Sequence, residues 1–236
     1  NVELFENSAL KYWKKNSNKV DCYFMSSKIV TEKIIFATNG FLRSMGIKSS
    51  YNFPITLTAS MTRPLTDTEF SLLGKPKEWG VLPVRPMGAT VRMTKDRRIL
   101  IRNTAEFKKS LVMMQSEIFQ RSKYQKIGIQ KRFPILPENI IESTWSGIVS
   151  RSRNSSQIFE KINDNIYVAG TYNGSGIGVG TLFGEQIAIK CIGEKSKEIE
   201  IIESRKKPNL LPPEPFLSIG AKAKLFYERL RAKSEI

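Results

Sequence analysis

The 236-residue chain contains no histidine. Without an imidazole, Ser-His and Cys-His nucleophilic catalysis and histidine-ligated metal sites are excluded. The two cysteines, Cys22 and Cys191, stand far apart and outside any C-x-x-C pattern. This spacing argues against a metal or redox centre and fits a reducing, cytoplasmic setting. If the chain is an enzyme, we therefore expect a cofactor, and no metal, to carry the chemistry.

The sequence also lacks any run of about 18 or more apolar residues, so no membrane-spanning helix is expected. Acidic residues are few: 22 Asp and Glu stand against 38 Lys and Arg, a formal charge of +16. Such a charge suggests nucleic acid as a partner. However, the basic residues are scattered rather than gathered into one arm or stripe, so nucleic-acid binding is not the favoured function.

Apolar patterning in the first third of the chain predicts strands at residues 2–6, 20–24 and 33–38. The segment 33–38 contains the apolar run Ile34–Ala37 and is followed by Asn39-Gly40. A run of this kind is typical of a strand buried on both faces in a parallel sheet. The sequence opens at Asn1 without an initiator methionine, as expected of a chain cut from a longer one.

The middle of the chain predicts an antiparallel meander, with strands at 55–62, 79–82, 90–94 and 98–102. Lys95-Asp96-Arg97 is the predicted hairpin turn between the last two strands. Thr104 is a candidate cap for a helix from about Ala105 to Tyr124. The remaining predicted elements are a strand at 140–151, a turn at 163–165, a strand at 166–169, a helix at about 179–192, a proline-rich strap and a helix at 219–231.

The most distinctive local pattern is a strand, a glycine-rich turn and a helix between Ile166 and Ile192. Five glycines fall within eleven residues, at positions 170, 174, 176, 178 and 180. Glycines let the backbone approach a flat ligand, and a helix N-terminus attracts negative charge. The same glycines would also serve tight strand–helix packing, and the pattern leaves both interpretations open. It is not a G-x-G-x-x-G fingerprint, because position 179 is Val.

Several motifs occur in an order that resembles one family. Trp145-x-Gly147, then Arg153-Asn154, then Ala169-Gly170-x-Tyr-Asn-Gly-x-Gly-Ile-Gly-x-Gly-Thr-x-x-Gly184 is similar to the C-terminal signature of FAD-dependent oxidoreductases of the D-amino-acid-oxidase-like family. Ile34–Gly40 resembles that family's mid-chain strand with its A-T-N-G ending. The resemblance spans nearly the whole chain. It is nearest to the gamma-glutamylputrescine oxidase and sarcosine oxidase-like branches.

The resemblance implies an α/β (α+β) fold, with a partial FAD-binding domain on a mainly parallel sheet and an antiparallel-sheet substrate domain. The implied domains are 1–50 (partial FAD-binding), 51–144 (substrate, antiparallel sheet plus helix), 145–193 (flavin-side return) and 194–236 (C-terminal strap and helix). The family's N-terminal dinucleotide-binding βαβ unit is absent from the sequence. We therefore expect a fragment of a flavoenzyme, or a split protein completed by a separate chain that carries the G-x-G-x-x-G segment. An apolar sheet edge at residues 34–36 should then be exposed.

The resemblance further implies FAD as the cofactor and a small amine or amino acid as the substrate, whose C–N bond is oxidised by hydride transfer to flavin. The implied cofactor-binding residues are Thr38, Asn39, Gly40, Gly147, Asn154, Gly170, Asn173, Gly174, Ser175, Gly176, Ile177 and Gly178. No catalytic residue is assigned. Asn154 and Asn173 have a second interpretation as asparagines that cap loops.

The substrate is not determined by the sequence. Arginine binds carboxylates through its planar fork, and Arg92, Arg102 and Arg151 lie on predicted strands. A surface role is the alternative for each of them. Two other functions stay open for the chain: a basic binding protein, for example on nucleic acid, and a non-catalytic remnant of the flavoenzyme.

Overall fold

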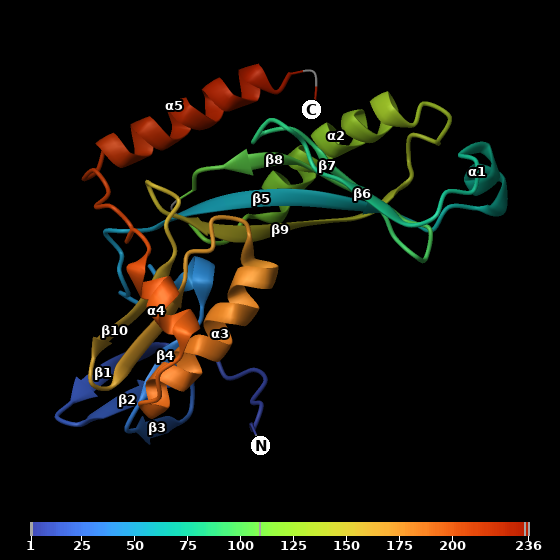
Figure 1. Cartoon of the computed structure of the whole chain (residues 1–236). Helices are drawn as coiled ribbons and strands as arrows, with labels where there is room; N and C mark the ends of the chain where they lie inside the picture. The colour runs from blue at the N-terminus through green and yellow to red at the C-terminus, as the bar shows by residue number, and fades with distance from the viewer. Residues whose placement is uncertain (1, 109, 234, 236) are drawn as a thin grey trace. The chain divides into compact units, whose positions relative to one another are not determined.

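The computed structural model describes residues 2–108, 110–233 and 235, which form two compact units (Figure 1). Unit 1 comprises the residues up to Phe53 and Val149–Leu211; unit 2 comprises Pro54–Ile148 and the residues from Pro212 onward. Each unit is therefore assembled from segments distant in sequence. Strands and helices occur in both, and the α/β (α+β) fold class is confirmed.

Unit 1 contains two small sheets. The first is antiparallel, in the order β1 (Tyr12–Asn16), β2 (Lys19–Tyr23), β3 (Lys28–Thr31). The second has the order β10 (Ile158–Asn163), β11 (Ile166–Gly170), β4 (Ile34–Phe36). In the second sheet β10 and β11 are antiparallel, and β11 and β4 are parallel. The predicted turn at 163–165 joins β10 to β11.

Strand β4 is the edge of its sheet in the described part of the chain, because β11 alone pairs with it there. Ile35 is 38% exposed, whereas Phe36 is buried against Leu42 and Val168. The predicted exposed apolar edge is thus confirmed at Ile35 and wrong at Phe36. The predicted strand at 2–6 is wrong: these residues pair with no strand, and their apolar side chains are exposed.

Two helices cover the second sheet of unit 1. Helix α3 (Gly176–Ile192) packs against β11, and α4 (Lys197–Ser204) packs against α3. Phe183 and Ile187 of α3 join Phe159 and Tyr167 of the sheet in one buried cluster, to which α4 adds Ile199 and Ile202. The sequence predicted α3 with a start three residues too late, and it did not predict α4.

Unit 2 is built on one five-stranded sheet, in the order β6 (Trp79–Val81), β7 (Thr90–Met93), β8 (Ile99–Glu106), β5 (Phe53–Thr62), β9 (Ile141–Arg151). The pairs β6–β7, β7–β8 and β8–β5 are antiparallel. The predicted meander and its hairpin at 95–97 are confirmed. Figure 1 shows α2 (Gln115–Arg132) and α5 (Phe216–Arg231) on the same side of this sheet.

The helix predicted at 105–124 lies further along the chain. Residues 105 and 106 continue β8, because they pair with Leu57 and Thr56 of β5. Strand pairing therefore overrides the apolar spacing that indicated a helix. Helix α2 begins only at Gln115, where the Glu117 carboxylate accepts the Met114 backbone N–H at 2.9 Å. Thr104 is a strand residue and caps no helix.

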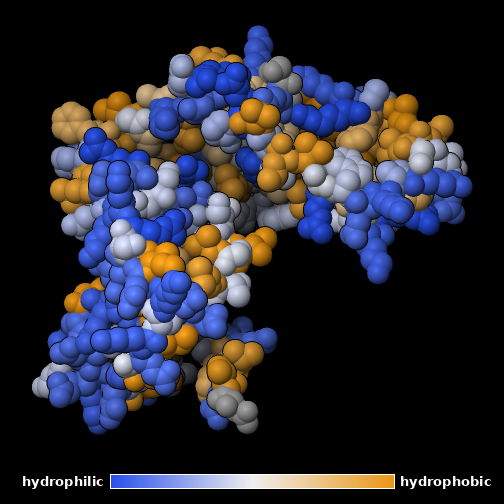
Figure 2. Space-filling view, in the orientation of Figure 1, coloured by the Kyte–Doolittle hydropathy of each residue, from blue (hydrophilic) through white to orange (hydrophobic). Residues whose placement is uncertain are grey.

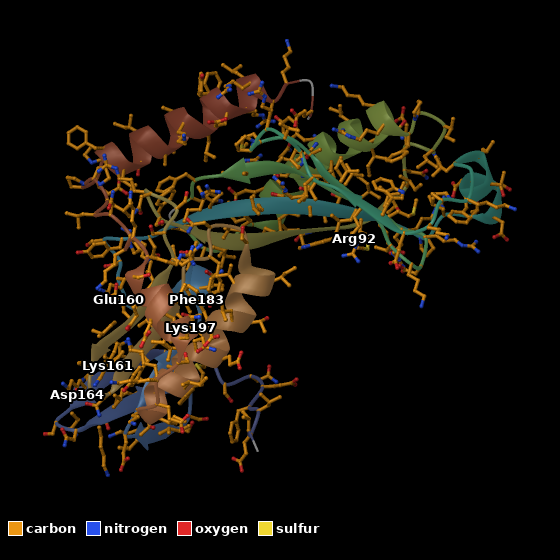
Figure 3. The ribbon with its side chains drawn as sticks, viewed as in Figure 1. Arg92, Glu160, Lys161, Asp164, Phe183 and Lys197 are labelled. Atoms are coloured by element: carbon orange, nitrogen blue, oxygen red, sulfur yellow. The ribbon has the colours of Figure 1, made fainter. Side chains whose placement is uncertain are left out.

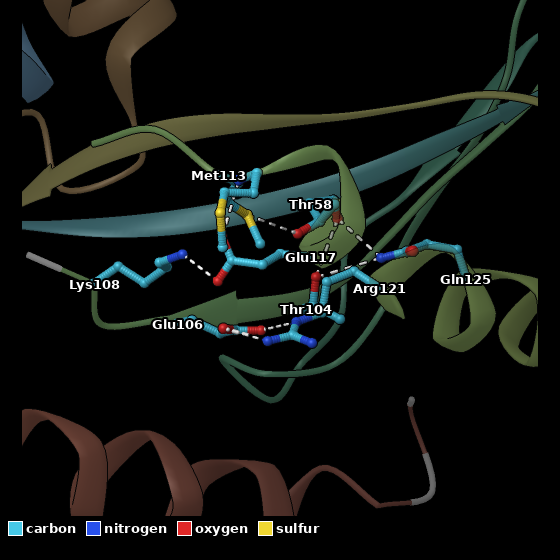
Figure 4. A network of polar contacts seen from close by, with 9 residues as sticks. Thr58, Thr104, Glu106, Lys108, Met113, Glu117, Arg121 and Gln125 are labelled. Atoms are coloured by element: carbon cyan, nitrogen blue, oxygen red, sulfur yellow. Dashed lines mark hydrogen bonds and ion pairs between the residues drawn. The ribbon is translucent and has the colours of Figure 1, made fainter. Parts of the chain in front are cut away.

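A polar network joins α2 to the sheet (Figure 4). The buried amide of Gln125 donates to the Thr58 carbonyl at 3.2 Å and to the Thr104 hydroxyl at 3.3 Å. Arg121 forms a two-pronged ion pair with Glu106 near the end of β8. These contacts hold α2 on one face of the sheet. Since successive side chains of a strand point to opposite faces, every second residue points to the face on which α2 does not lie.

The short helix α1 (Asp67–Leu72) carries a pH-sensitive contact. Both Glu69 oxygens accept from Arg63, at 2.7 and 2.8 Å, and Glu69 also completes a capping box with Thr66. The hydrogen bonds from Arg63 lower the pKa of Glu69 to about 2. Because the pKa of this carboxyl is lower in the folded chain than in the unfolded chain, its ionised form stabilises the fold at pH values above the unfolded-state pKa. This stabilisation is lost as the pH falls toward the folded-state pKa.

We expect Glu69→Gln to lower the free energy of unfolding by about 1–2 kcal/mol at neutral pH, because it removes the charge-assisted pair. The difference from the unsubstituted chain should shrink as the pH falls from about 5 to about 2. Urea titrations across that range measure it, with Glu78→Gln on an exposed side chain as the control. An equal difference at every pH would contradict the prediction.

Candidate functional site

The predicted cofactor-binding residues of unit 1 gather at one edge of its second sheet. Because β4 and β11 are parallel, with Phe36 beside Val168, their carboxyl ends meet at the same edge. The 3-10 turn η1 (Asn39–Phe41) follows β4, and the loop 171–175 follows β11. The Tyr172 N–H donates to the Asn39 side-chain oxygen at 3.3 Å, which joins the two segments. Ligands of parallel sheets bind outside this edge.

The loop after β11 is held in a constrained shape. Thr171, Asn173 and Gly174 all have left-handed backbones, with φ of 57°, 56° and 100°. For a β-branched residue such as Thr171 this conformation is costly, about 1–3 kcal/mol. The Asn173 amide donates to the Thr171 carbonyl at 2.8 Å, and the Thr171 hydroxyl lies 3.1 Å from that of Ser150. These bonds fix the backbone that leads into α3.

Asn173 and Asn154 use their side chains to brace the chain. The Asn173 side-chain oxygen accepts the Ser152 N–H at 2.9 Å. The Asn154 amide donates to the Lys207 carbonyl at 2.8 Å, and its oxygen accepts the Asn209 N–H at 3.1 Å. Of the two interpretations open for these asparagines, the geometry favours the one in which they hold loops.

Four glycines of the turn and of α3 fall into two classes that the sequence did not separate. A Cβ added at Gly176 or Gly180 would lie 3.6 or 3.5 Å from the Tyr172 ring, an ordinary van der Waals contact, so both glycines face this ring. A Cβ added at Gly174 or Gly178 would meet nothing within 4 Å. The first pair therefore lies against the Tyr172 ring, and open space lies beside the second. Tyr172 itself was missed as a structural element of the site.

The N-terminus of α3 is the positive end of the helix dipole, and no described capping side chain or first-turn acidic residue compensates it. Its N-cap residue, Ser175, makes no side-chain cap bond, and the described first turn contains no acidic residue. Ile177 is 94% exposed. Free N–H groups and the helix dipole at such a terminus favour a negatively charged ligand. Because no described side chain covers the backbone at Gly174 and Gly178, a flat ligand can approach it closely.

Gly170 has a structural role at the same edge. A Cβ there would lie 2.6 Å from Leu42 Cδ1 and 3.3 Å from Asn39 Cα. We expect Gly170→Ala to lower the free energy of unfolding by about 1–3 kcal/mol through overpacking. Thermal or urea unfolding measures this, with Gly184→Ala in open space on α3 as the control. The control should be neutral or stabilising, because alanine favours helix. Unchanged stability of the Gly170 variant would refute the packing role.

Of the other predicted site residues, Thr38 and Gly40 lie at this edge, and Gly147 and Arg151 lie on β9. Thr38 is exposed and its carbonyl accepts the Phe41 N–H, while Gly40 is buried within η1. Gly147 is an exposed residue of β9 and belongs to unit 2, so it is not part of the cluster described above. Arg151 is exposed at the end of β9.

Arg102 and Arg92 lie on the face of the five-stranded sheet away from α2. Their neighbours Ile101 and Val91 point into the core beside α2, and strand side chains alternate between faces. Figure 3 shows Arg92 on the side of the sheet opposite α2. Arg102 is half-buried and donates to the Thr90 hydroxyl at 2.6 Å, whereas Arg92 is exposed. Burial lowers the pKa of the Arg102 guanidinium.

Arg102 has no carboxylate partner in the described part of unit 2. A half-buried cation paired only with a hydroxyl is suited to an anionic ligand. Among the described residues, no group of three or more His, Cys, Asp or Glu is placed to hold a metal ion. Nor is any helix within residues 2–108, 110–233 and 235 long and apolar enough to cross a membrane.

Comparison with solved structures identifies the fold. The chain superposes on L-proline dehydrogenase from P. horikoshii with a TM-score of 0.61 at 20% identity, over 84% of this chain and 53% of that one. Glycine oxidase from Geobacillus kaustophilus gives 0.60 at 14% identity, over 82% and 50%. Fructosamine oxidase from Aspergillus fumigatus gives 0.63 at 11% identity, over 84% and 52%.

Sequence comparison points the same way. A curated relative, the probable oxidoreductase OrdL of Haemophilus influenzae, is 22% identical over 221 residues, 89% of this chain and 47% of the relative. The chain thus spans about half the length of the proteins it matches. The FAD dependent oxidoreductase family, DAO, matches residues 1–188. The chain therefore belongs to the family of FAD-dependent oxidoreductases.

Proposed function

We propose that this chain forms the flavin-side and substrate-binding parts of an oxidoreductase that oxidises the C–N bond of an amine or amino acid. The observation that carries the proposal is the uncapped α3 N-terminus with open backbone at Gly174 and Gly178, at the carboxyl edge of a parallel strand pair. Names of structural neighbours support the reaction class: they include a proline dehydrogenase and a glycine oxidase.

The residues at this edge fit a flavin. A flavin is flat and carries negative charge at its pyrimidine edge when reduced. The open space beside Gly178 admits a ring system, and the backbone N–H groups of Gly176 and Ile177 supply donors at the helix end. Thr38 and Asn39, in the turn after β4, are proposed to lie on the ADP side of the cofactor.

FAD, when bound, supplies the acceptor for the hydride that leaves the carbon next to the substrate nitrogen. The N-terminus of α3 stabilises negative charge placed against it, by about 0.3–1 kcal/mol and up to about 2 when partly buried. The braced loop keeps this terminus in position without moving during turnover, because Asn173 and Ser150 already hold Thr171. Since the chain has no histidine, it supplies no imidazole to act on the substrate proton.

For the substrate, we propose a small molecule with a carboxylate, that is, an amino acid, held by Arg102. The half-buried guanidinium has donors left after its bond to Thr90, and its partly desolvated position strengthens a pair with an anion. Arg92, on the same face, is exposed and would attract the anion only weakly.

We further propose that unit 1 belongs to the FAD-binding domain and unit 2 to the substrate domain. The unit limits after Phe53 and Ile148 lie near the implied boundaries at 50 and 144, whereas the limit after Leu211 lies 18 residues beyond the implied boundary at 193. The dinucleotide-binding segment, from a separate chain or from another part of the same protein, would pair with the edge of β4 near Ile35 that no other described strand occupies. The two free, buried cysteines support a cytoplasmic setting.

An absorbance spectrum of protein purified from its native source tests the proposed function. Visible flavin bands are the expected result, with the dinucleotide-binding segment present either on the same polypeptide or as a second chain in the preparation. The recombinant 236-residue chain alone should not retain FAD at a one-to-one ratio, because the pyrophosphate and ribose contacts of the first βαβ unit are missing. Native protein without flavin that binds DNA in a strongly salt-dependent way would instead support a basic binding protein.

A further inference from the structure

Helix α5 has two apolar faces. The inner face packs on unit 2: Leu217 and Ala232 are buried, Ala221 and Leu225 are partly buried, and Arg229 stacks on the Tyr124 ring of α2 at 5.0 Å. The outer face is covered by nothing in the described part of the chain. Packing on unit 2 uses only one apolar face of α5, so the second apolar face is not required for this packing.

The outer face, which we call the apolar stripe, runs the length of the helix. Its large side chains are between 56% and 67% exposed: Phe216, Ile219, Phe226, Tyr227 and Leu230. At about 100° per residue these positions fall within an arc of about 100°. In Figure 2 orange and blue side chains adjoin along the upper edge, where α5 lies in Figure 1. Exposed apolar residues arranged in one stripe mark an interaction surface.

Basic residues border the apolar stripe on both sides. Lys222 and Lys233 lie along one border, and Lys224 and Arg231 along the other. Arg231 extends over the Tyr227 ring at 5.5 Å. The acidic residue of the helix, Glu228, lies on the inner side and pairs with Lys224 at 3.7 Å. The surface around the stripe is therefore cationic from Lys222 to Lys233.

We propose that α5 lies in the interface of an anionic lipid membrane, with the apolar stripe inserted below the headgroups. Lys and Arg on long stems can keep their charges among anionic headgroups while the apolar side chains enter the acyl region. A tyrosine at the border of the stripe suits the same boundary. At about 24 Å, a 16-residue helix lies along the surface and does not span the bilayer.

The positive charges beside the apolar stripe make a second copy of this chain an unfavourable binding partner for it. Two stripes packed face to face would place Lys222, Lys224 and Arg231 of each copy against the same cations of the other. Like charges across an interface cost free energy and weaken the pair. An anionic lipid surface neutralises both borders at once, which a single acidic helix does less completely.

Vesicle sedimentation with the 236-residue chain tests the proposal, using phosphatidylcholine vesicles with about one-third phosphatidylserine, and pure phosphatidylcholine vesicles for comparison. We expect binding to the anionic vesicles and at least about tenfold weaker binding to the neutral ones. Since a chain of charge +16 attracts anions non-specifically, the decisive variant keeps its charge. Phe226→Ser with Leu230→Ser should weaken binding to anionic vesicles by at least about tenfold.

Leu82→Ser with Val84→Ser is the matched control, because both side chains are exposed elsewhere in unit 2. This variant should bind as the unsubstituted chain does. Lys222→Gln, Lys224→Gln and Arg231→Gln together should weaken binding at least about tenfold, and Lys75→Gln with Lys77→Gln much less. Circular dichroism melts should be unchanged for the serine variants, since the substituted side chains are exposed.

Equal binding by the stripe variant and its control would overturn the proposal, as would no binding to anionic vesicles. Self-association on size-exclusion chromatography that the Phe226/Leu230 variant abolishes would also overturn it, in favour of a second copy as the occupant. Release of the bound chain by about 0.5 M salt, with the stripe variant released at lower salt, would support the combined apolar and electrostatic interaction.

Discussion

Gly178→Val in the flavin-bearing protein is expected to reduce FAD affinity at least about a hundredfold while leaving the fold intact. Gly178 is in the first turn of α3, and a Cβ there meets no atom of the chain within 4 Å. The chain itself therefore tolerates a side chain at this position. A flavin lying against the exposed backbone does not, because the added isopropyl group would hold the ring away from the helix N–H groups.

The control for this variant is Gly184→Val. Gly184 is on the same helix, also has nothing within 4 Å of an added Cβ, and is further from the N-terminus. Both substitutions should change the free energy of unfolding by similar small amounts, since glycine and valine are both poor helix formers. The flavin content of the two variants, expressed in the native host and read from the visible spectrum, separates ligand contact from helix stability. Equal, normal flavin content in both would remove α3 from the flavin site.

Local sequence predicted the strand, turn and helix of this segment because they are consecutive in the chain. Residues 166–170, the glycine turn and the start of α3 follow one another, and each has a strong local preference. The division of the glycines was not predictable. It depends on where the Tyr172 ring packs, and that ring is placed by Phe183 of α3, 5.9 Å away between centroids.

Elsewhere, the predictions from sequence were wrong or incomplete where pairing with another strand determines the secondary structure. The apolar spacing of Phe107, Leu111 and Met114 suggested a helix, but β5 holds the preceding residues in β8. Strand β10 was missed because it is defined by its pairing with β11 across the turn at 163–165. A local sequence pattern does not show that pairing. Arg92 and Arg102 share a sheet face and a residue type, so the burial that distinguishes them comes from their neighbours.

That difference in burial leads to the second large expected effect. Arg102→Met should lower kcat/KM for an amino-acid substrate by about 30-fold to 1,000-fold, mainly through a higher KM. Removing one partner of a buried charged hydrogen-bonded pair costs about 2–5 kcal/mol. Met retains the length and apolar volume of the arginine stem, so packing beside Thr90 is largely kept.

Two comparisons make the Arg102 result specific. Arg92→Met removes an equal charge from the same face at an exposed position and should change KM no more than a few-fold. A substrate amine without a carboxylate should react with the Arg102 variant about as well as with the unsubstituted enzyme, because it never paired with the guanidinium. Steady-state kinetics over both substrate classes, with flavin content measured in parallel, provides the test. If Arg102→Met and Arg92→Met raise KM equally for the amino acid, the anion is attracted by the general positive charge of this face, and Arg102 is not its binding partner.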